Sequence, residues 1–428
     1  MTTHTKPGVP TPAGRSRVPR LLRQAQFRRY WSAQTISLFG DQVSLLAVPL
    51  LAVLALGAGP AQMGYLTAAG LIPNLLLPVV AGAWVDTYPH KRRLMIIADL
   101  GRAALLAVVP VLWWTGTLAL PQLYVVAFLV GTLAVLFEVA HASLFVALVD
   151  KPDYVEANTL LNGSRAASFV VGPSIGGVLI QALTAPIAVL VDAVSYVASA
   201  LFLTRIRAVE PPAAPRHGLG VTVGLRYLAG SAILRSLLLG TTTINLFNYM
   251  FAALFVLYAT AELGISAGVL GAIIGASSVG ALIGAAVTGR LSRRIGIGPT
   301  LVVSFVLFPA PLMLVPLAGG PDAVILAMIF TAEFLSALGV MMLDITVGSV
   351  QIAATAETML ARVQGAKRTV NYGIRPIGAL IGGALGTAIG VRPALWIATA
   401  GAVTGVLWVL GSPAARLHQL PDSEPVRP

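Results

Sequence analysis

The stretch Thr35-Ile-Ser-Leu-Phe39 decides the fold, because a close copy of it, Thr243-Ile-Asn-Leu-Phe247, stands about 207 residues further along the chain. Each copy lies in a long apolar segment. The same shift, to within one residue, aligns further pairs: Gly64 with Gly271, Gly82 with Gly289, Glu138 with Asp344, and Gly176-Gly177 with Gly382-Gly383. Two apolar halves in parallel repeat are typical of transporters whose halves rock against each other around a central site.

The composition is that of a membrane protein. Of 428 residues, 57% are hydrophobic and 10% are charged, whereas about a quarter of the residues are charged in an average soluble domain. Apolar runs of about 20 residues, the length of a membrane-spanning helix, lie near 33–56, 64–84, 94–115, 121–148, 160–184, 186–204, 236–260, 266–289, 298–318, 322–350, 369–389 and 392–411. We therefore expect an all-α, polytopic membrane protein in which twelve helices form two pseudo-symmetric six-helix bundles.

The net charge of +12 could indicate nucleic-acid binding, so the placement of the 28 basic residues matters. They gather before the first predicted helix and in alternate loops, and of the loops on the other side only one carries a basic residue, Arg392. An excess of Lys and Arg is typical of cytoplasmic loops. We therefore expect a multi-pass protein of the plasma (inner) membrane with both termini in the cytoplasm, a lipid bilayer as its surroundings, and no nucleic-acid partner.

Polar interruptions divide the predicted helices into domains. We expect a cytoplasmic tail over 1–32, an N-terminal bundle over 33–204, a cytoplasmic linker over 205–235, a C-terminal bundle over 236–411 and a tail over 412–428. The sequence contains no cysteine, and its five histidines are scattered, which excludes thiol chemistry and disfavours a metal site. A nucleophile, base or metal constellation is therefore missing. We expect no enzyme, catalytic residue, metal or cofactor.

Two loops carry related motifs. One reads Gly82-Ala-Trp-Val-Asp86-Thr-Tyr-Pro-His90-Lys91-Arg92-Arg93, and a degenerate copy reads Gly289-Arg-Leu-Ser-Arg293-Arg294-Ile-Gly296. The first resembles the loop motif of the major facilitator superfamily, G-x-x-x-D-R-x-G-R-[KR], from which Thr87, Pro89 and His90 depart. The resemblance implies the major facilitator fold and a conformational latch made by Gly82, Asp86, Lys91, Arg92, Arg293 and Arg294. The alternative is that the carboxylate only caps a turn and the basic residues only set the topology.

The predicted helix over 160–184 contains Gly163, Ser168 and then Gly172-Pro173-Ser-Ile-Gly176-Gly177. Small residues allow close helix packing, and a proline introduces a kink. The string resembles the motif G-P-x-x-G-G of antiporter branches of the superfamily, which implies export. A generic packing seam is the alternative, because Gly382-Gly383 recur in the second half. The opening Phe27-Arg-Arg-Tyr-Trp31 further resembles the siderophore-exporter and macrolide-efflux branch.

Several ionisable residues lie inside predicted helices, where each one costs at least ~2.5–3.5 kcal/mol at the helix centre. Because burial disfavours the charged form of a carboxylate, such groups could exchange a proton for substrate. The proton-coupling candidates are Asp41, Glu138, His141, Glu333 and Asp344. Counting from the helix ends places Asp41, Glu138 and Asp344 in the cytoplasmic half of the membrane and Glu333 nearer its middle.

Polar residues on the faces of two predicted helices are candidates for lining a substrate cavity: Gln34, Ser37, Asn245 and Asn248. The alternative for the carboxylates is permanent pairing, for instance of Glu138 with His141 or an arginine, which would only hold helices together. Asp192 is expected to be structural. Asp99 and Arg102, three residues apart, are expected to form a local ion pair.

Taken together, these patterns favour a secondary active transporter. We expect a proton-coupled antiporter that exports a small amphipathic molecule, such as a drug, siderophore or metabolite, by alternating access. The proton gradient would supply the energy without a cofactor, the partner would be the small-molecule substrate, and the protein would be a monomer. An importer or uniporter of the same fold is the alternative, and an enzyme embedded in the membrane is a remote one.

Overall fold

The computed structural model of the chain describes residues 19–88, 90–207 and 221–421, with only the backbone described for 78–87 and 221. Every secondary-structure element in these residues is a helix, and no strand occurs among them. Ten helical segments are long and apolar enough to cross a membrane. The two other predicted spans correspond to α3 (Pro60–Thr87) and α14 (Leu360–Ile389). The expected all-α membrane fold is confirmed.

The N-terminal half consists of one short helix and six long ones. They are α1 (Arg20–Arg23), α2 (Ala25–Leu54), α3, α4 (Lys91–Trp114), α5 (Leu120–Leu148), α6 (Tyr154–Leu183) and α7 (Ala185–Thr204), with the single turn η1 (Lys151–Asp153) before α6. Buried apolar side chains from these helices form much of the core, including Leu50 and Leu51 of α2, which are fully buried.

The C-terminal half repeats this arrangement with more interruptions. Its helices are α8 (Val221–Gly230), α9 (Ala232–Leu257), α10 (Ala267–Ile295), α11 (Ile297–Leu307), α12 (Leu314–Leu317), α13 (Asp322–Ala354), α14, α15 (Val391–Val403) and α16 (Gly405–Leu410). Single turns complete it: η2 (Tyr258–Glu262), η3 (Ala310–Met313), η4 (Glu357–Met359) and η5 (Pro413–Arg416). The predicted span over 298–318 is broken after Leu307 because Pro309 and Pro311 lack the N–H donors that would continue the helix.

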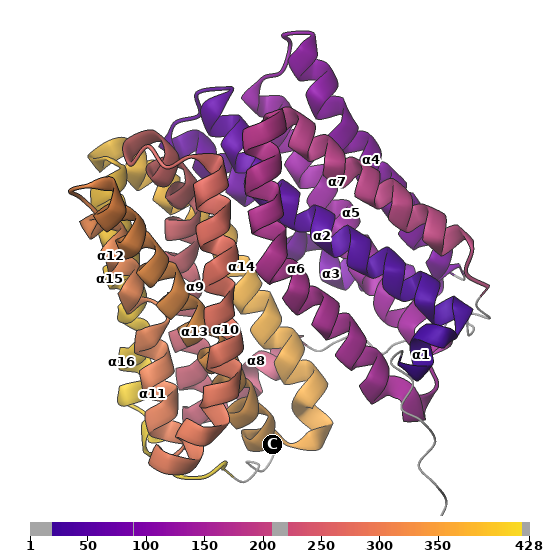
Figure 1. Cartoon of the computed structure of the whole chain (residues 1–428). Helices are drawn as coiled ribbons and strands as arrows, with labels where there is room; N and C mark the ends of the chain where they lie inside the picture. Colours follow the sequence, from indigo (N-terminus) through magenta and orange to yellow (C-terminus); the bar gives the residue numbers. More distant parts are fainter. Residues whose placement is uncertain (1–18, 89, 208–220, 422–428) are drawn as a thin grey trace, which may run out of the picture.

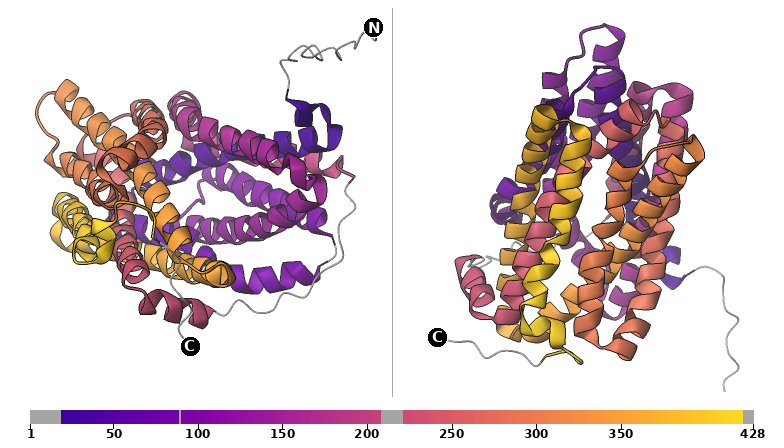
Figure 2. Two further views of the ribbon diagram at one scale, coloured as in Figure 1. Left: turned by 90° about the horizontal axis from the view of Figure 1, so that it is seen from below. Right: turned by 90° about the vertical axis from the view of Figure 1, so that its left-hand side faces the viewer.

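Both ends of the described chain lie on one side of the molecule, at the bottom of Figure 1, together with α1, α8 and η5. This side is termed the terminal side and the opposite one the far side. Because successive long helices alternate in direction, α2, α4, α6, α9, α11 and α14 begin on the terminal side. Figure 2 shows the C-terminal half, in red to yellow, beside the N-terminal half, in indigo to magenta.

Two seams join the halves on the far side, and repeat-related glycines build both. A Cβ atom added to Gly64 of α3 would lie 3.0 Å from Cα of Gly383 in α14. A Cβ atom added to Gly177 of α6 would lie 3.0 Å from Cα of Gly271 in α10. No side chain fits between the helices at these points, so the backbones pack directly. The residues that the sequence repeat aligns therefore form two equivalent seams.

Several helices extend beyond their predicted ends on the terminal side. α2 begins at Ala25 rather than near residue 33, and α14 begins at Leu360 rather than near 369. The added turns carry long basic side chains that can reach water at a membrane surface, so an apolar-run criterion cuts them off. Asp41 therefore lies 16 residues after the first residue of α2, and its expected place in the cytoplasmic half of the membrane stays a prediction. The predicted linker over 205–235 also contains a helix, α8.

Candidate functional site

A cavity of about 920 Å³ lies between the two halves on the terminal side. Side chains of α9, α13 and α14 line it from the C-terminal half, and side chains of α3 and α5 line it from the N-terminal half. Because the glycine seams close the far side, the cavity is entered from the terminal side. Its volume lies within the range of about 300–1,000 Å³ in which proteins bind drug-sized molecules.

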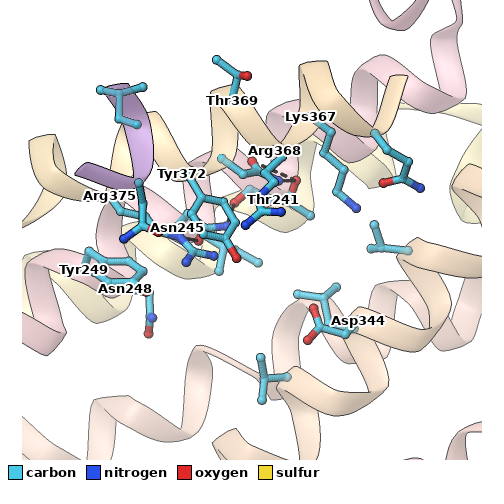
Figure 3. A pocket seen from close by; sticks show the side chains of 18 of the residues that line it. Thr241, Asn245, Asn248, Tyr249, Asp344, Lys367, Arg368, Thr369, Tyr372 and Arg375 are labelled. Carbon is cyan, nitrogen blue, oxygen red and sulfur yellow. Dashed lines mark hydrogen bonds between the residues drawn. The ribbon is translucent and has the colours of Figure 1, made fainter. Parts of the chain in front are cut away.

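One wall of this cavity is strongly basic (Figure 3). Lys367, Arg368 and Arg375, here termed the basic face, all line the cavity from α14. Residues seven and eight apart lie on the same side of a helix, so the three cations point in similar directions. The Lys367 ammonium donates a hydrogen bond of 2.6 Å to Oε1 of Gln351, at the end of α13.

Two tyrosine rings hold the guanidinium of Arg375. Its Cζ atom lies 4.0 Å from the ring centroid of Tyr372 and 5.0 Å from that of Tyr249. Its Nε donates a hydrogen bond of 2.9 Å to Oδ1 of Asn245 in α9. A planar guanidinium stacks favourably on aromatic rings, and each contact limits its rotation. Arg375 is therefore a positioned cation rather than a mobile one.

Amide and hydroxyl groups fasten α14 to α9 behind the basic face. Thr242 Oγ1 donates to Asn371 Oδ1 at 2.9 Å, and Asn371 Nδ2 donates to Thr241 Oγ1 at 3.2 Å. Asn371 is buried, so these hydrogen bonds satisfy a side chain that would otherwise be costly to bury. They fix the register of α14 against α9 and thereby the place of the basic face in the cavity.

Two exposed carboxylates complete the charge of the cavity. Asp344 lines it from α13 and Glu138 from α5, so the repeat-related pair comes from different halves. Within the described residues, no carboxylate lies within 4.0 Å of a cation of the basic face. With every group ionised, three positive and two negative side chains leave the lining with a net charge of +1.

The four polar residues predicted to line a substrate cavity separate into two groups. Asn245 and Asn248 of α9 line the cavity. Gln34 and Ser37 of α2 are buried and are not among its lining residues. The polar face of α2 instead packs inside the N-terminal half, where Asp41 of that face accepts a hydrogen bond from the Tyr196 hydroxyl of α7.

His141 pairs with an aromatic residue of α2 and not with Glu138. Its Nδ1 lies 2.7 Å from the hydroxyl of Tyr30, and the two rings stack with centroids 5.4 Å apart. The ring of Phe137 also stacks with the His141 ring, and their centroids lie 6.4 Å apart. The pairing of Glu138 with His141, one of the alternatives from the sequence, is therefore absent, and Glu138 projects into the cavity instead.

A second group of ionisable residues is buried inside the N-terminal half. The predicted ion pair between Asp99 and Arg102 of α4 is confirmed, and both residues are buried. The Arg102 guanidinium lies 4.1 Å from the ring centroid of Tyr196 in α7, and the Tyr196 hydroxyl donates to Asp41 Oδ1. Asp192 lies within electrostatic range of Asp41 and Arg102. The buried cluster therefore comprises Asp41, Asp99, Arg102, Asp192 and Tyr196.

Helix packing explains why these groups meet. Gly40, next to Asp41, lets α2 approach α7 so closely that an added Cβ atom would collide with Ser195 and Asp192. Ser195 Oγ in turn donates a hydrogen bond of 3.0 Å to Asp192 Oδ1. Sequence reasoning treated Asp192 and the pair on α4 as separate structural features, because the contacts join residues more than 90 positions apart.

Glu333 lies away from both groups. It stands eleven residues after the beginning of α13 on the far side, and it is not among the residues that line the cavity. Helical periodicity places it on the same face as Val340, which does line the cavity. Within the described part of the chain, Glu333 has no hydrogen-bond partner shown, and its proton-coupling role stays a prediction.

The predicted latch is only partly visible. Only the backbone is described at Gly82 and Asp86, so the contacts of the Asp86 carboxylate lie outside the described part of the chain. Arg92 at the start of α4 donates to the carbonyl oxygens of Thr204, at 3.3 Å, and Ile206, and so ties α4 to the end of α7. Lys91 is buried, whereas Arg293 and Arg294 are exposed in the last turn of α10. The latch stays a prediction.

The glycines of the predicted antiporter motif pack against different neighbours. Gly172 and Gly176 of α6 face α2, where a Cβ atom on Gly176 would lie 3.2 Å from Cα of Val43. Gly177 faces α10 of the other half, and Pro173 lies inside α6. An added Cβ atom on Gly163 meets nothing within 4 Å. The motif therefore combines packing within one half with a seam between the halves.

The basic face was missed by sequence reasoning. Lys367 and Arg368 precede the predicted start of the helix near residue 369. Both were counted as cytoplasmic charge, and Arg368 was considered otherwise only as a possible partner of Asp86 in the latch. The spacing of Lys367, Asn371 and Arg375, at i, i+4 and i+8, was the available signal, because it places polar groups on one side of a helix. Tyr372, three residues before Arg375, has the same kind of signal, whereas Tyr249 of α9 has none.

Comparisons with known proteins agree with this architecture. The family of transmembrane secretion effectors matches residues 19–424. The multidrug efflux pump Tap of Mycolicibacterium fortuitum is 27% identical over 386 residues, covering 82% of this chain and 87% of that protein. Tap of Mycobacterium tuberculosis H37Rv is also 27% identical, over 385 residues, covering 82% of this chain and 85% of its own.

Solved structures are similar in fold at low sequence identity. A mutant of the nucleoside transporter NupG matches with a TM-score of 0.73 at 13% identity, covering 90% of this chain and 99% of its own. A bacterial homologue of the iron transporter ferroportin in an inward-facing state matches with a TM-score of 0.73 at 17% identity, and the match covers 92% of this chain and 99% of that homologue. At these identities the similarity establishes the fold alone.

Proposed function

Because this chain belongs to the transmembrane secretion effectors, in the efflux branch of the major facilitator superfamily, we propose that it is a proton-coupled antiporter that exports a small amphipathic molecule by alternating access. The chain is a multi-pass membrane transporter; the coupling ion and the direction are the proposed part. A drug, a siderophore or a metabolite would fit the size of the cavity.

The observation that carries this proposal is the pairing of a closed far side with a cavity on the terminal side. We assign the terminal side to the cytoplasm because basic residues gather there, as the positive-inside rule expects. The substrate would then enter from the cytoplasm, and the glycine seams would have to part to release it outside. The relatives named as multidrug efflux pumps favour this direction over import.

The buried cluster supports proton coupling. Three carboxylates, on Asp41, Asp99 and Asp192, surround the one guanidinium of Arg102, so the four groups would carry −2 if all were ionised. Unpaired charge is costly to bury, which favours a bound proton on at least one carboxylate. Asp41 is the best candidate for exchanging that proton, because Asp99 is already bound to Arg102 in an ion pair.

Replacement of Asp41 by asparagine should reduce proton-driven transport at least tenfold, because the amide keeps the shape and the acceptor for Tyr196 but cannot release a proton. The measurement is accumulation of neutral, cationic and anionic fluorescent dyes by inside-out vesicles with an acidic interior. Glu138→Gln tests the carboxylate in the cavity in the same assay. Asp150→Asn, at an exposed position after α5, is the matched control and should transport as wild type does.

Accumulation that collapses with a protonophore and in Asp41→Asn, but not in Asp150→Asn, would support the proposed antiport. Accumulation that ignores the gradient, with Asp41→Asn and Glu138→Gln both equal to wild type, would make the carboxylates structural. An importer or uniporter of the same fold would then replace the exporter.

A further inference from the structure

The charge of the cavity bears on the chemical class of the substrate, and this inference rests on the export proposed above. The geometry points to an amphipathic organic anion, whose carboxylate or similar oxyanion binds the basic face of Lys367, Arg368 and Arg375 while its apolar part packs on the opposite wall. A cationic molecule would instead have to approach a lining with a net charge of +1.

The three cations are concentrated while the two carboxylates are dispersed. All three belong to α14, whereas Asp344 comes from α13 and Glu138 from the other half. Within the described chain, no carboxylate lies within 4.0 Å of any of these three cations. Figure 3 shows Asp344 across open space from Lys367 and Arg368. The positive charge of the basic face is therefore available to a ligand.

Arg368 has the geometry of an anion-binding residue. It is exposed to the cavity, and its Cζ atom lies 5.2 Å from the ring centroid of Tyr372. In the described residues its guanidinium has no hydrogen-bond acceptor shown. Five N–H donors in a planar fork match a carboxylate in a bidentate arrangement. Arg368 would make the first contact from the terminal side, and Arg375, positioned by its two tyrosines, would lie deeper.

The rest of the lining suits the apolar part of such a molecule. Val340, Leu343 and Val347 of α13 line the cavity opposite the basic face, with Phe308 beyond the end of α11 and Leu75 of α3. A ligand with one anionic end and one apolar end can contact both walls at once. The membrane potential, negative inside, would also favour the outward movement of an anion.

A different use of the basic face is that it only binds Glu138 when the terminal side closes. The two uses give different results in a binding experiment. The probes are fluorescein, which is anionic, and rhodamine 123, which is cationic on the same three-ring scaffold. Binding of each dye to the full-length protein in lipid nanodiscs is measured by fluorescence anisotropy, and accumulation is measured in inside-out vesicles under a pH gradient.

Fluorescein should bind at least tenfold more tightly than rhodamine 123. Lys367→Gln and Arg368→Gln should each weaken fluorescein binding at least tenfold, and Asp344→Asn should strengthen it, because these changes alter the charge of the lining in opposite directions. Arg362→Gln is the matched control. It removes the same charge from an exposed position on α14 that does not line the cavity, so it should leave fluorescein binding unchanged.

Equal or tighter binding of rhodamine 123 would overturn the anion assignment, and its proton-driven accumulation would leave export standing. An Arg368→Gln protein that binds fluorescein like wild type but no longer transports it would also overturn the assignment, since the cation would then serve only the movement of the halves. Fluorescein that binds through the basic face but is never accumulated under a pH gradient would support the anion site and refute the proposed export.

Discussion

Replacing Gly177 by valine is expected to reduce transport at least tenfold. A Cβ atom at this position of α6 would lie 2.7 Å from the carbonyl oxygen of Ala267 and 3.0 Å from Cα of Gly271. Both contacts involve the backbone of α10, which cannot turn away as a side chain can. The far-side seam must therefore open. A penalty of about 1.4 kcal/mol against the closed seam already lowers its population tenfold relative to the open one.

The absence of cysteine makes this shift measurable without background labelling. A single Asn248→Cys change places a thiol in the cavity lining, and a membrane-impermeant maleimide added to inside-out vesicles reports access from the terminal side. Labelling should fall when Gly177→Val is added. Gly163→Val is the matched control, because it adds the same side chain to α6 where an added Cβ atom meets nothing within 4 Å.

The repeat-related change, Gly64→Val, should act in the same direction, since a Cβ atom there would lie 2.7 Å from the carbonyl oxygen of Ala379 and 3.0 Å from Cα of Gly383. Rapid transport and unchanged cavity labelling in Gly177→Val would show that the seam is not an obligatory contact of the transport cycle. An equal loss in Gly163→Val would assign the effect to valine in α6 and not to the seam.

The sequence predicted the outline of this molecule because apolar length and internal repetition are local properties. Runs of about 20 apolar residues located the long helices, and the repeat paired Gly64 with Gly271 and Gly177 with Gly383. It did not reveal that each glycine contacts a member of the other pair. That contact depends on how the two halves are rotated against each other, which no spacing along the chain encodes.

The candidate site was less predictable for a physical reason. Charged turns lower the mean hydropathy of a window, so the start of α14 was assigned to a loop although Lys367 and Arg368 lie inside the helix. The contact of Arg102 with Tyr196 likewise joins two helices far apart in sequence, α4 and α7. Sequence reasoning identified Asp41, Asp99 and Asp192 one by one but could not assemble them around one guanidinium.

Replacing Arg102 by leucine is expected to destabilise the protein by about 3–5 kcal/mol, the cost of removing one partner from a buried ion pair. Arg102 is buried, and its loss would leave Asp99 without its ion-pair partner and would remove a positive charge near Asp41 and Asp192. The measurement is thermal unfolding of the purified protein in detergent, followed by tryptophan fluorescence at several pH values.

The pH dependence separates this cause from a simple packing defect. Carboxylates left buried without a cation favour the protonated form, so the folded variant binds more protons than its unfolded chain. The loss in its free energy of unfolding, relative to wild type, should therefore shrink as the pH falls. A second change, Asp99→Leu, should recover at least half of the loss because it removes one unpaired charge.

Arg392→Leu provides the comparison for this pH dependence. Arg392 donates to the carbonyl oxygens of Pro316, at 2.7 Å, and Ala318, at 2.8 Å, so its removal breaks hydrogen bonds without leaving a carboxylate unpaired. The loss in the free energy of unfolding of Arg392→Leu should not change with pH. If the Arg102→Leu deficit were equally constant, or if Asp99→Leu deepened it, the carboxylates would not depend on Arg102 for charge compensation. The cluster could then not hold the exchangeable proton that the antiport requires.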